Sequence, residues 1–176
     1  GKQSSDPKGI WYTAQSGLWQ SVWLESVPEY YITSLKMTPH FDEKELELII
    51  NTNHDGKAQV ELEGQFYEVN TNEAVRLCVN ELHPWSPDTP YLYDFKVQFE
   101  QDYISSYFAM RKYSIEKDKD GIKRLFLNNK PLFHTGLLDQ GYLSETLLSW
   151  PCDQAMIDDI KAAKSMGFNM LRKHIK

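Results

Sequence analysis

The sequence contains little cysteine, no long apolar run and no signal-peptide pattern. Its two cysteines, Cys78 and Cys152, lie far apart in a spacing that fits neither a zinc site nor a disulfide framework. We therefore expect both to be free and buried, with a single long-range disulfide as the alternative. No stretch approaches the roughly 20 apolar residues of a transmembrane helix, so we expect no membrane partner. Without a targeting segment, the localisation stays unknown.

An excess of positive charge is also lacking. Lysine and arginine number 19 against 25 aspartates and glutamates, which gives a net charge of -6. That balance disfavours a nucleic-acid partner held by phosphate attraction, and the basic RKHIK ending does not change it. Aromatic residues, by contrast, make up 13% of the chain. Such a content is typical of a large β core, or of a surface that stacks on sugars or bases.

Short runs with strand character follow one another through the first two thirds of the chain. Several of them alternate apolar and polar residues, and turn signals such as His54-Asp55-Gly56 and the proline-rich HPWSPDTP separate them. The predicted strands cover residues 18–25, 30–37, 45–52, 57–63, 73–80, 91–100 and 103–115. Strands of this length and spacing predict a mainly β fold with an immunoglobulin-like β-sandwich.

The pattern changes after residue 117. RLFLNNKPLF predicts a hairpin whose turn is Asn128-Asn129. PLFHTGLLDQG is a nearly continuous apolar run, and a helix follows with Met156, Ile160 and Ala163 on one face, ending at Gly167. Residues 168–171 form a second apolar run, so the order predicts a βαβ unit of a parallel sheet. Because one such unit buries too little surface alone, we expect it to be the truncated start of a larger domain.

Three motifs occur in a defined order: SGLWQSVWLE, then HPWSPDTPYLY with FAMRKYSI, then NNKPLFHTGLLDQG followed by MGFNMLRKHIK. Together they resemble glycoside hydrolases of family 2, which include β-galactosidases, β-glucuronidases and β-mannosidases. The resemblance implies three parts: residues 1–27 from the end of a jelly-roll sugar-binding domain, 28–117 as the sandwich, and 118–176 as the start of a catalytic (β/α)8 barrel. The chain is thus expected to be an internal fragment of a longer enzyme.

The same resemblance implies a retaining mechanism with two glutamates on later barrel strands. A retaining glycosidase needs two carboxylic side chains about 5–5.5 Å apart. We expect neither to lie in this chain, so it should have no activity alone. Two Asn-Glu pairs do occur, Asn72-Glu73 and Asn80-Glu81, but they precede the barrel segment and are expected to be structural.

Candidate pocket residues lie at the ends of the two predicted barrel strands: Asp139 and Gln140 after the first, Arg172 and His174 after the second. In (β/α)8 barrels the C-terminal strand ends face the active site. Relatives carry an arginine at the position of Arg172, where it can orient a catalytic glutamate. The match is weaker for His174, which stands one position earlier than in many relatives. Thr135 replaces an arginine that is common in the family.

Trp11, Trp19, Trp23 and Trp85 are expected in domain cores or interfaces rather than on sugar-stacking surfaces. For the parent enzyme we expect a carbohydrate substrate. In this chain we expect no cofactor and no metal site, and the need of the parent enzyme for a metal stays open. Exposed apolar residues in 130–176 predict association of copies. The alternative is a stand-alone, non-catalytic β-sandwich module that binds carbohydrate or protein. The βαβ pattern disfavours that alternative, since a binding module does not need it.

Overall fold

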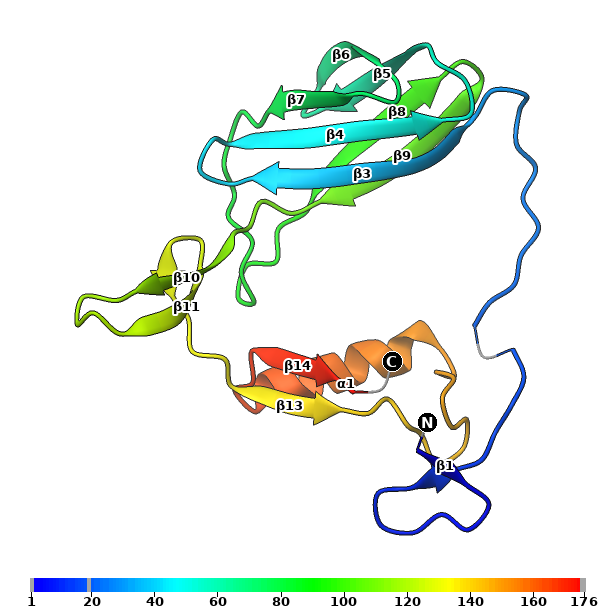
Figure 1. The fold of residues 1–176 in the computed structure, drawn as a ribbon, viewed down its shortest axis with the longest axis vertical. Helices are drawn as coiled ribbons and strands as arrows, with labels where there is room; N and C mark the ends of the chain where they lie inside the picture. Colours follow the sequence, from blue (N-terminus) through cyan, green and yellow to red (C-terminus); the bar gives the residue numbers. More distant parts are fainter. Residues whose placement is uncertain (1, 19, 175–176) are drawn as a thin grey trace. The chain divides into compact units, whose positions relative to one another are not determined.

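A computed structural model describes residues 2–18 and 20–174, which fall into two compact units (Figure 1). One unit joins Gly1–Leu24 to Phe133–Lys176, and the other is Glu25–Leu132. The domain boundaries predicted after residues 27 and 117 stay predictions.

The unit Glu25–Leu132 contains two antiparallel sheets stacked as a β-sandwich (Figure 1), as predicted. The first sheet has the order β3-β4-β7 and the second the order β6-β5-β8-β9. Their bounds are β3 Ile32–His40, β4 Glu45–Thr52, β5 Lys57–Leu62, β6 Gln65–Asn70, β7 Ala74–Cys78, β8 Tyr93–Phe99 and β9 Asp102–Phe108.

Alternation of side chains builds the core between the two sheets. In β8 the residues Tyr93, Phe95, Val97 and Phe99 are each at most 2% exposed, while every residue between them is exposed. Strands β4 and β5 bury their apolar residues in the same period of two. Because successive strand side chains point to opposite faces, one face of each sheet meets the core and the other meets solvent.

Strand β6 has no counterpart among the predicted strands. It pairs with β5 across a turn at Glu63 and Gly64, whose φ angles of 49° and 75° fit a tight hairpin. Its alternation is weak, because Val69 is its one buried residue and Phe66 is 64% exposed. The pattern was therefore too faint to be recognised in the sequence.

The predicted strand 103–115 is two strands, and this is a correction. β9 ends at Phe108, the chain bends through Met110, which is fully buried, and β10 (Tyr113–Lys117) begins a separate sheet. β10 pairs with β11 (Lys123–Leu127), which pairs with β12 (Lys130–Pro131). The predicted turn is confirmed, since Asn128 and Asn129 have φ angles of 52° and 64° between β11 and β12.

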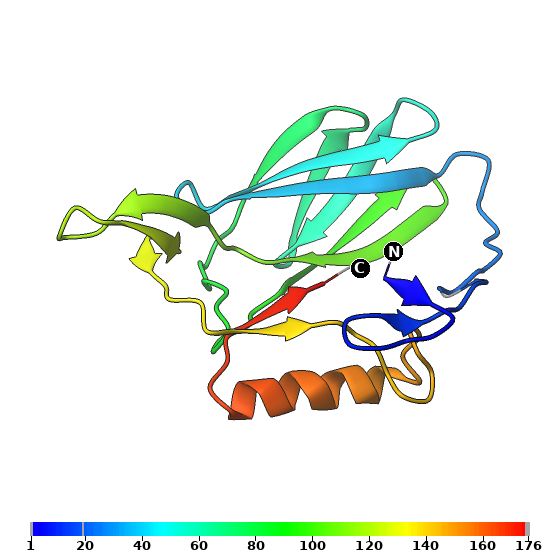
Figure 2. The same cartoon turned by 60° about the horizontal axis from the view of Figure 1, so that its bottom comes forward.

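The second unit contains the predicted βαβ arrangement. β13 (Gly136–Asp139) and β14 (Met170–Lys173) run parallel, and α1 (Asp153–Ser165) connects them and lies along one face of the pair (Figure 2). Gly167, at φ 88°, follows the helix and allows the backbone to turn into β14. A Cβ built on Gly136 would lie 3.3 Å from the carbonyl oxygen of Met170 and would overlap the end of its side chain, so a larger residue here would require Met170 to shift.

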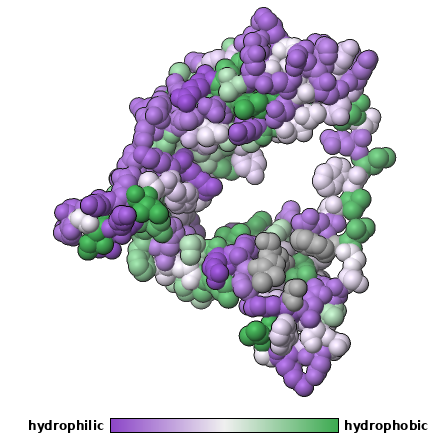
Figure 3. Space-filling view, in the orientation of Figure 1, coloured by the Kyte–Doolittle hydropathy of each residue, from purple (hydrophilic) through white to green (hydrophobic). Residues whose placement is uncertain are grey.

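The predicted strand 18–25 is wrong for the residues described. Trp19 lies outside them, while residues 18 and 20–25 have no regular structure. A strand needs a hydrogen-bonded neighbour, and no described strand pairs with this stretch. Its side chains are accordingly exposed, from 75% for Val22 to 100% for Leu24, and Figure 3 shows hydrophobic residues along this extended segment.

Two further expectations about burial need correction. Trp11 and Trp23 are 50% and 76% exposed, so neither lies in a core of the described residues, and their place in an interface stays a prediction; Trp85 is half-buried beneath the guanidinium of Arg111. Cys78 and Cys152 are free, as predicted, but both are exposed. Cys78 follows the buried Leu77 in β7, so alternation turns it to the solvent side. No helix in the described ranges is both long and apolar enough to cross a membrane.

Candidate functional site

The candidate site lies at the C-terminal ends of β13 and β14. The parallel register places Leu138 beside Arg172 and Asp139 beside Lys173, so both strands end at the same edge. The backbone N–H of His174 donates to the carbonyl of Asp139 at 2.9 Å and extends this pairing by one step. Three of the four predicted pocket residues, Asp139, Arg172 and His174, are therefore brought together at neighbouring strand ends. Gln140 follows Asp139 and is half-buried.

Asp139 is the most firmly held of these residues. Its carboxylate accepts a hydrogen bond from the backbone N–H of Gly141 at 2.8 Å and forms an ion pair with Lys173. The side chain of Asp139 is 19% exposed, against 53% for Lys173. The ammonium of Lys173 also lies 5.8 Å from the centre of the Trp150 ring, within cation–π range. A carboxylate with this many partners is oriented before any ligand arrives.

Arg172 and Asp139 belong to opposite faces of the strand pair, because Arg172 is in register with Leu138 rather than with Asp139. Arg172 is exposed, and no ion pair links it to another residue in 2–18 or 20–174. A guanidinium in this position retains its donors for an acceptor brought by a ligand or by another part of the protein.

Lys2 contributes to the site, and no motif in the sequence indicates this. Its ammonium lies 3.2 Å from Nε2 of His174, across 172 positions of sequence. A lysine ammonium has only donors, so His174 Nε2 is the acceptor of this contact. The contact adds a cation to the edge that already carries Arg172 and Lys173.

Tyr12 and Tyr142 attach the N-terminal segment to the strand ends. Their rings stack with centroids 4.9 Å apart and planes 15° apart. The backbone N–H of Thr13 donates to the hydroxyl of Tyr142 at 3.2 Å. Tyr12 belongs to β2 (Tyr12–Thr13), which pairs with β1 (Gln3–Ser4), so one short element positions both Tyr12 and the neighbourhood of Lys2.

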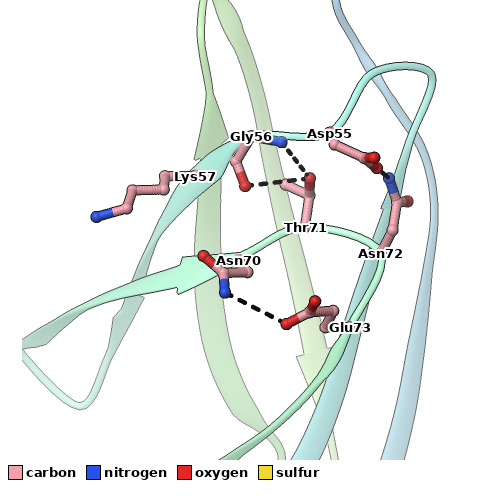
Figure 4. Close-up of a pocket in the computed structure, with 7 residues that line it drawn as sticks. All are labelled: Asp55, Gly56, Lys57, Asn70, Thr71, Asn72 and Glu73. Carbon is pink, nitrogen blue, oxygen red and sulfur yellow. Dashed lines mark hydrogen bonds between the residues drawn. The ribbon is translucent and has the colours of Figure 1, made fainter.

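A separate polar pocket of about 510 Å³ lies on the sandwich, lined by residues 55–57 and 70–73 (Figure 4). It contains the Asn72-Glu73 pair, and its polar groups bond to one another. Asn72 donates to Asp55 at 2.6 Å and accepts from the backbone of Thr52 at 2.9 Å, while Glu73 accepts from Asn70 at 3.2 Å. These bonds hold two turns together, which supports a structural role for the pair.

The other Asn-Glu pair is similarly engaged. The backbone N–H of Asn80 donates to Glu63 at 2.8 Å, and the carboxylate of Glu81 lies 3.6 Å from His83. No three His, Cys, Asp or Glu side chains in the described residues are arranged to hold a metal ion.

Comparison with known proteins identifies the sandwich. Residues 30–111 match the family described as Glycosyl hydrolases family 2. A β-galactosidase of Leuconostoc mesenteroides subsp. mesenteroides is 36% identical over 110 residues, which cover 60% of this chain and 10% of that protein. The chain therefore spans about a tenth of this curated relative.

Solved structures share the fold over a longer stretch. A β-glucuronidase of Faecalibacterium prausnitzii matches with a TM-score of 0.71 and 18% identity, covering 83% of this chain and 24% of that one. A β-glucuronidase from Ruminococcus gnavus in complex with D-glucuronic acid matches with a TM-score of 0.67 and 15% identity, covering 83% and 26%. Over residues 30–111 of its β-sandwich, the chain is similar to the glycosyl hydrolases of family 2.

Proposed function

We propose that the chain is part of a retaining glycoside hydrolase that cleaves O-glycosidic bonds, with β-galactosides as the first substrates to test. The observation that carries the proposal is the family match over residues 30–111. The 36% identity to a β-galactosidase supports this choice of sugar. The carbohydrate complex of the Ruminococcus gnavus β-glucuronidase supports carbohydrate as the substrate class.

The strand-end residues are assigned to substrate binding and positioning. Asp139 is ion-paired and hydrogen-bonded, so we give it the role of accepting from sugar hydroxyls rather than attacking a sugar carbon. Arg172 makes no ion pair within residues 2–18 and 20–174, and it is suited to orient a carboxylate through paired hydrogen bonds. Gln140 and His174 complete the set of pocket residues, each able to donate and accept.

The acid/base and nucleophile are assigned to carboxylates outside these 176 residues. Retention requires two carboxylic groups about 5–5.5 Å apart, each free to react. Asp139 is engaged by Lys173, and the two Asn-Glu pairs bond to neighbouring loops. On this proposal the sandwich is a scaffold, and the 176-residue chain alone hydrolyses nothing.

The test compares this chain with a longer product of the same gene on aryl β-galactoside, β-glucuronide and β-mannoside substrates. We expect the longer protein to hydrolyse one of them with retention of anomeric configuration, and the 176-residue chain to hydrolyse none. In the longer protein, Arg172→Ala should lower kcat/KM about 100-fold or more by misplacing the reacting groups. Arg76→Ala, an exposed arginine of β7, is the matched control and should change little. Failure of the longer protein on all three substrates, or inversion, contradicts the proposal.

A further inference from the structure

The outer face of the sheet β6-β5-β8-β9 has a mixed aromatic and polar surface. Cross-strand partners share a face, so the register places Phe66, Glu61, Lys96 and Ser105 in one row across the sheet. The next row contains Glu68, Gln59, Gln98 and Tyr103. Tyr107 lies beside Asp94 beyond the first row. We call this set the outer sheet face.

Exposed aromatic rings stand at defined points of the outer sheet face. Tyr103 and Tyr107 are 55% and 61% exposed, and Phe66 on the opposite edge strand is 64% exposed. Tyr103, Ser105 and Tyr107 are successive outward positions of β9, so a small residue separates two large rings. Four residues of strand place those two side chains about 13–14 Å apart. Together they lie at the two ends of a polar strip along the strand.

Hydrogen-bonding groups lie beside and between the two rings. The ammonium of Lys96 donates to Glu61 at 3.1 Å. That bond is the main cause that raises the pKa of Lys96, and Tyr103 adds to it, so the three side chains form one network. Gln59 and Gln98 add neutral amides that both donate and accept. Lys57 and Glu68 make a second ion pair on the same face.

We propose that the outer sheet face binds a neutral oligosaccharide lying along β9, with sugar rings stacked on Tyr103 and Tyr107. Sugar hydroxyls both donate and accept, so they can replace water around Lys96, Glu61 and the two glutamines without leaving a charge unpaired. A protein surface pressed onto this face would have to desolvate two ion pairs, which is costly. The outer sheet face carries two lysines and three carboxylates, from Glu61, Glu68 and Asp94. Its charge is therefore slightly negative and does not attract a polyanion.

The test titrates the 176-residue chain with cellohexaose, xylohexaose and β-1,4-galactohexaose, using calorimetry and backbone amide shifts. We expect saturable binding of at least one oligosaccharide with a Kd of about 1 mM or tighter, and shifts in β8 and β9. Tyr103→Ala and Tyr107→Ala should each weaken binding about tenfold through lost ring stacking. Tyr103→Phe should retain most of it, since the ring remains.

Two controls separate this surface from other sites. Trp23→Ala removes a more exposed aromatic from the other unit, and Arg172→Ala removes the strand-end guanidinium; neither should change the affinity. Absence of binding for all three oligosaccharides overturns the inference. Binding that survives the Tyr103→Ala/Tyr107→Ala double variant, or that Arg172→Ala abolishes, also overturns it. Because no catalytic step is measured, the result is independent of the proposed hydrolase activity.

Discussion

Tyr142 shows how a single side chain holds a distant segment. It stacks on Tyr12 and accepts from the backbone N–H of Thr13 at 3.2 Å, across 129 positions of sequence. An aromatic pair contributes about 0.5–1.5 kcal/mol beyond buried area, and a hydrogen bond a net of about 0.5–1.5 kcal/mol. Both contacts favour the position of the segment of Lys2 and Tyr12 at the strand ends.

Tyr142→Ala should release this segment, because both contacts are lost. We expect amide hydrogen exchange at residues 12–13 to accelerate about tenfold or more, as a loss of roughly 1.4 kcal/mol or more implies. Tyr142→Phe keeps the stacked ring and should cause a smaller increase. Tyr30→Ala, at a tyrosine of the sandwich unit that contacts His54, should leave residues 12–13 unchanged. Equal exchange in Tyr142→Ala and the wild type would argue against the anchoring role.

At the scale of elements, the hairpin β10–β12 is tied to the sandwich by its turn. Asn128 accepts from the backbone N–H of Lys112 at 3.0 Å and donates to the carbonyl of Trp85 at 2.9 Å. Asn129 donates to Asp42 at 2.8 Å, and Lys112 donates to the same carboxylate at 2.6 Å. The two asparagines thus adopt the positive φ angles of the turn and also attach the hairpin to the sandwich.

The Asp42 network should make this attachment sensitive to acid. Hydrogen bonds from Asn129 and then Lys112 hold the pKa of Asp42 below its ordinary value of 3.8. A carboxyl with a lowered folded-state pKa stabilises the fold above its unfolded pKa, and loses that contribution as pH falls through the folded pKa. We therefore expect the stability difference between wild type and Asp42→Asn to be present at pH 7 and to vanish as pH falls from about 4 to about 2.

Urea unfolding across that pH range measures the difference. Asn129→Ala removes the donor that contributes most to the lowered pKa, so it should shift the acid transition of the wild type toward higher pH. A difference between wild type and Asp42→Asn that is the same at pH 7 and at the acid limit would refute the assignment.

At the scale of the whole molecule, residues of the same type in similar stretches of sequence differ in their burial. Leu48 of β4 is 0% exposed in the sandwich core, while Leu24 in the extended segment is 100% exposed. Both stand in apolar stretches of short-strand character. The difference arises because Leu48 has sheet neighbours on both sides, Met37 and Val75, and faces the second sheet.

Leu48→Ala should destabilise the sandwich by about 2–5 kcal/mol, the sum of lost burial and a cavity. Leu24→Ala should change stability by less than about 0.5 kcal/mol, as exposed substitutions do. Denaturant titration followed by the amide signals of β8 reports the sandwich unit directly. A loss of more than about 1 kcal/mol from the sandwich in Leu24→Ala would mean that this leucine packs against that unit.

Local sequence patterns were sufficient to predict those elements whose structure depends on neighbouring residues alone. Strands β4, β5 and β8 bury every second residue, so a period of two identified them from the letters alone. The Asn128-Asn129 turn and the glycine after α1 depend on the backbone freedom of single residues, and both were predicted. Prediction failed for β6, whose face carries too few buried residues, and for the break at residues 109–112, where a buried Met110 continues the apolar run.

Burial in the N-terminal stretch and the composition of the strand-end site were decided by tertiary contacts alone. The parallel register of β13 and β14 brings Asp139 and Lys173 together, and the order of elements was enough to expect these strand ends to meet. Lys2 beside His174 and Tyr12 on Tyr142 are different, because each pair is separated by more than a hundred residues and no period relates them. Residues 20–25 are likewise exposed because no described strand pairs with them. The local sequence does not determine whether such a partner strand is present.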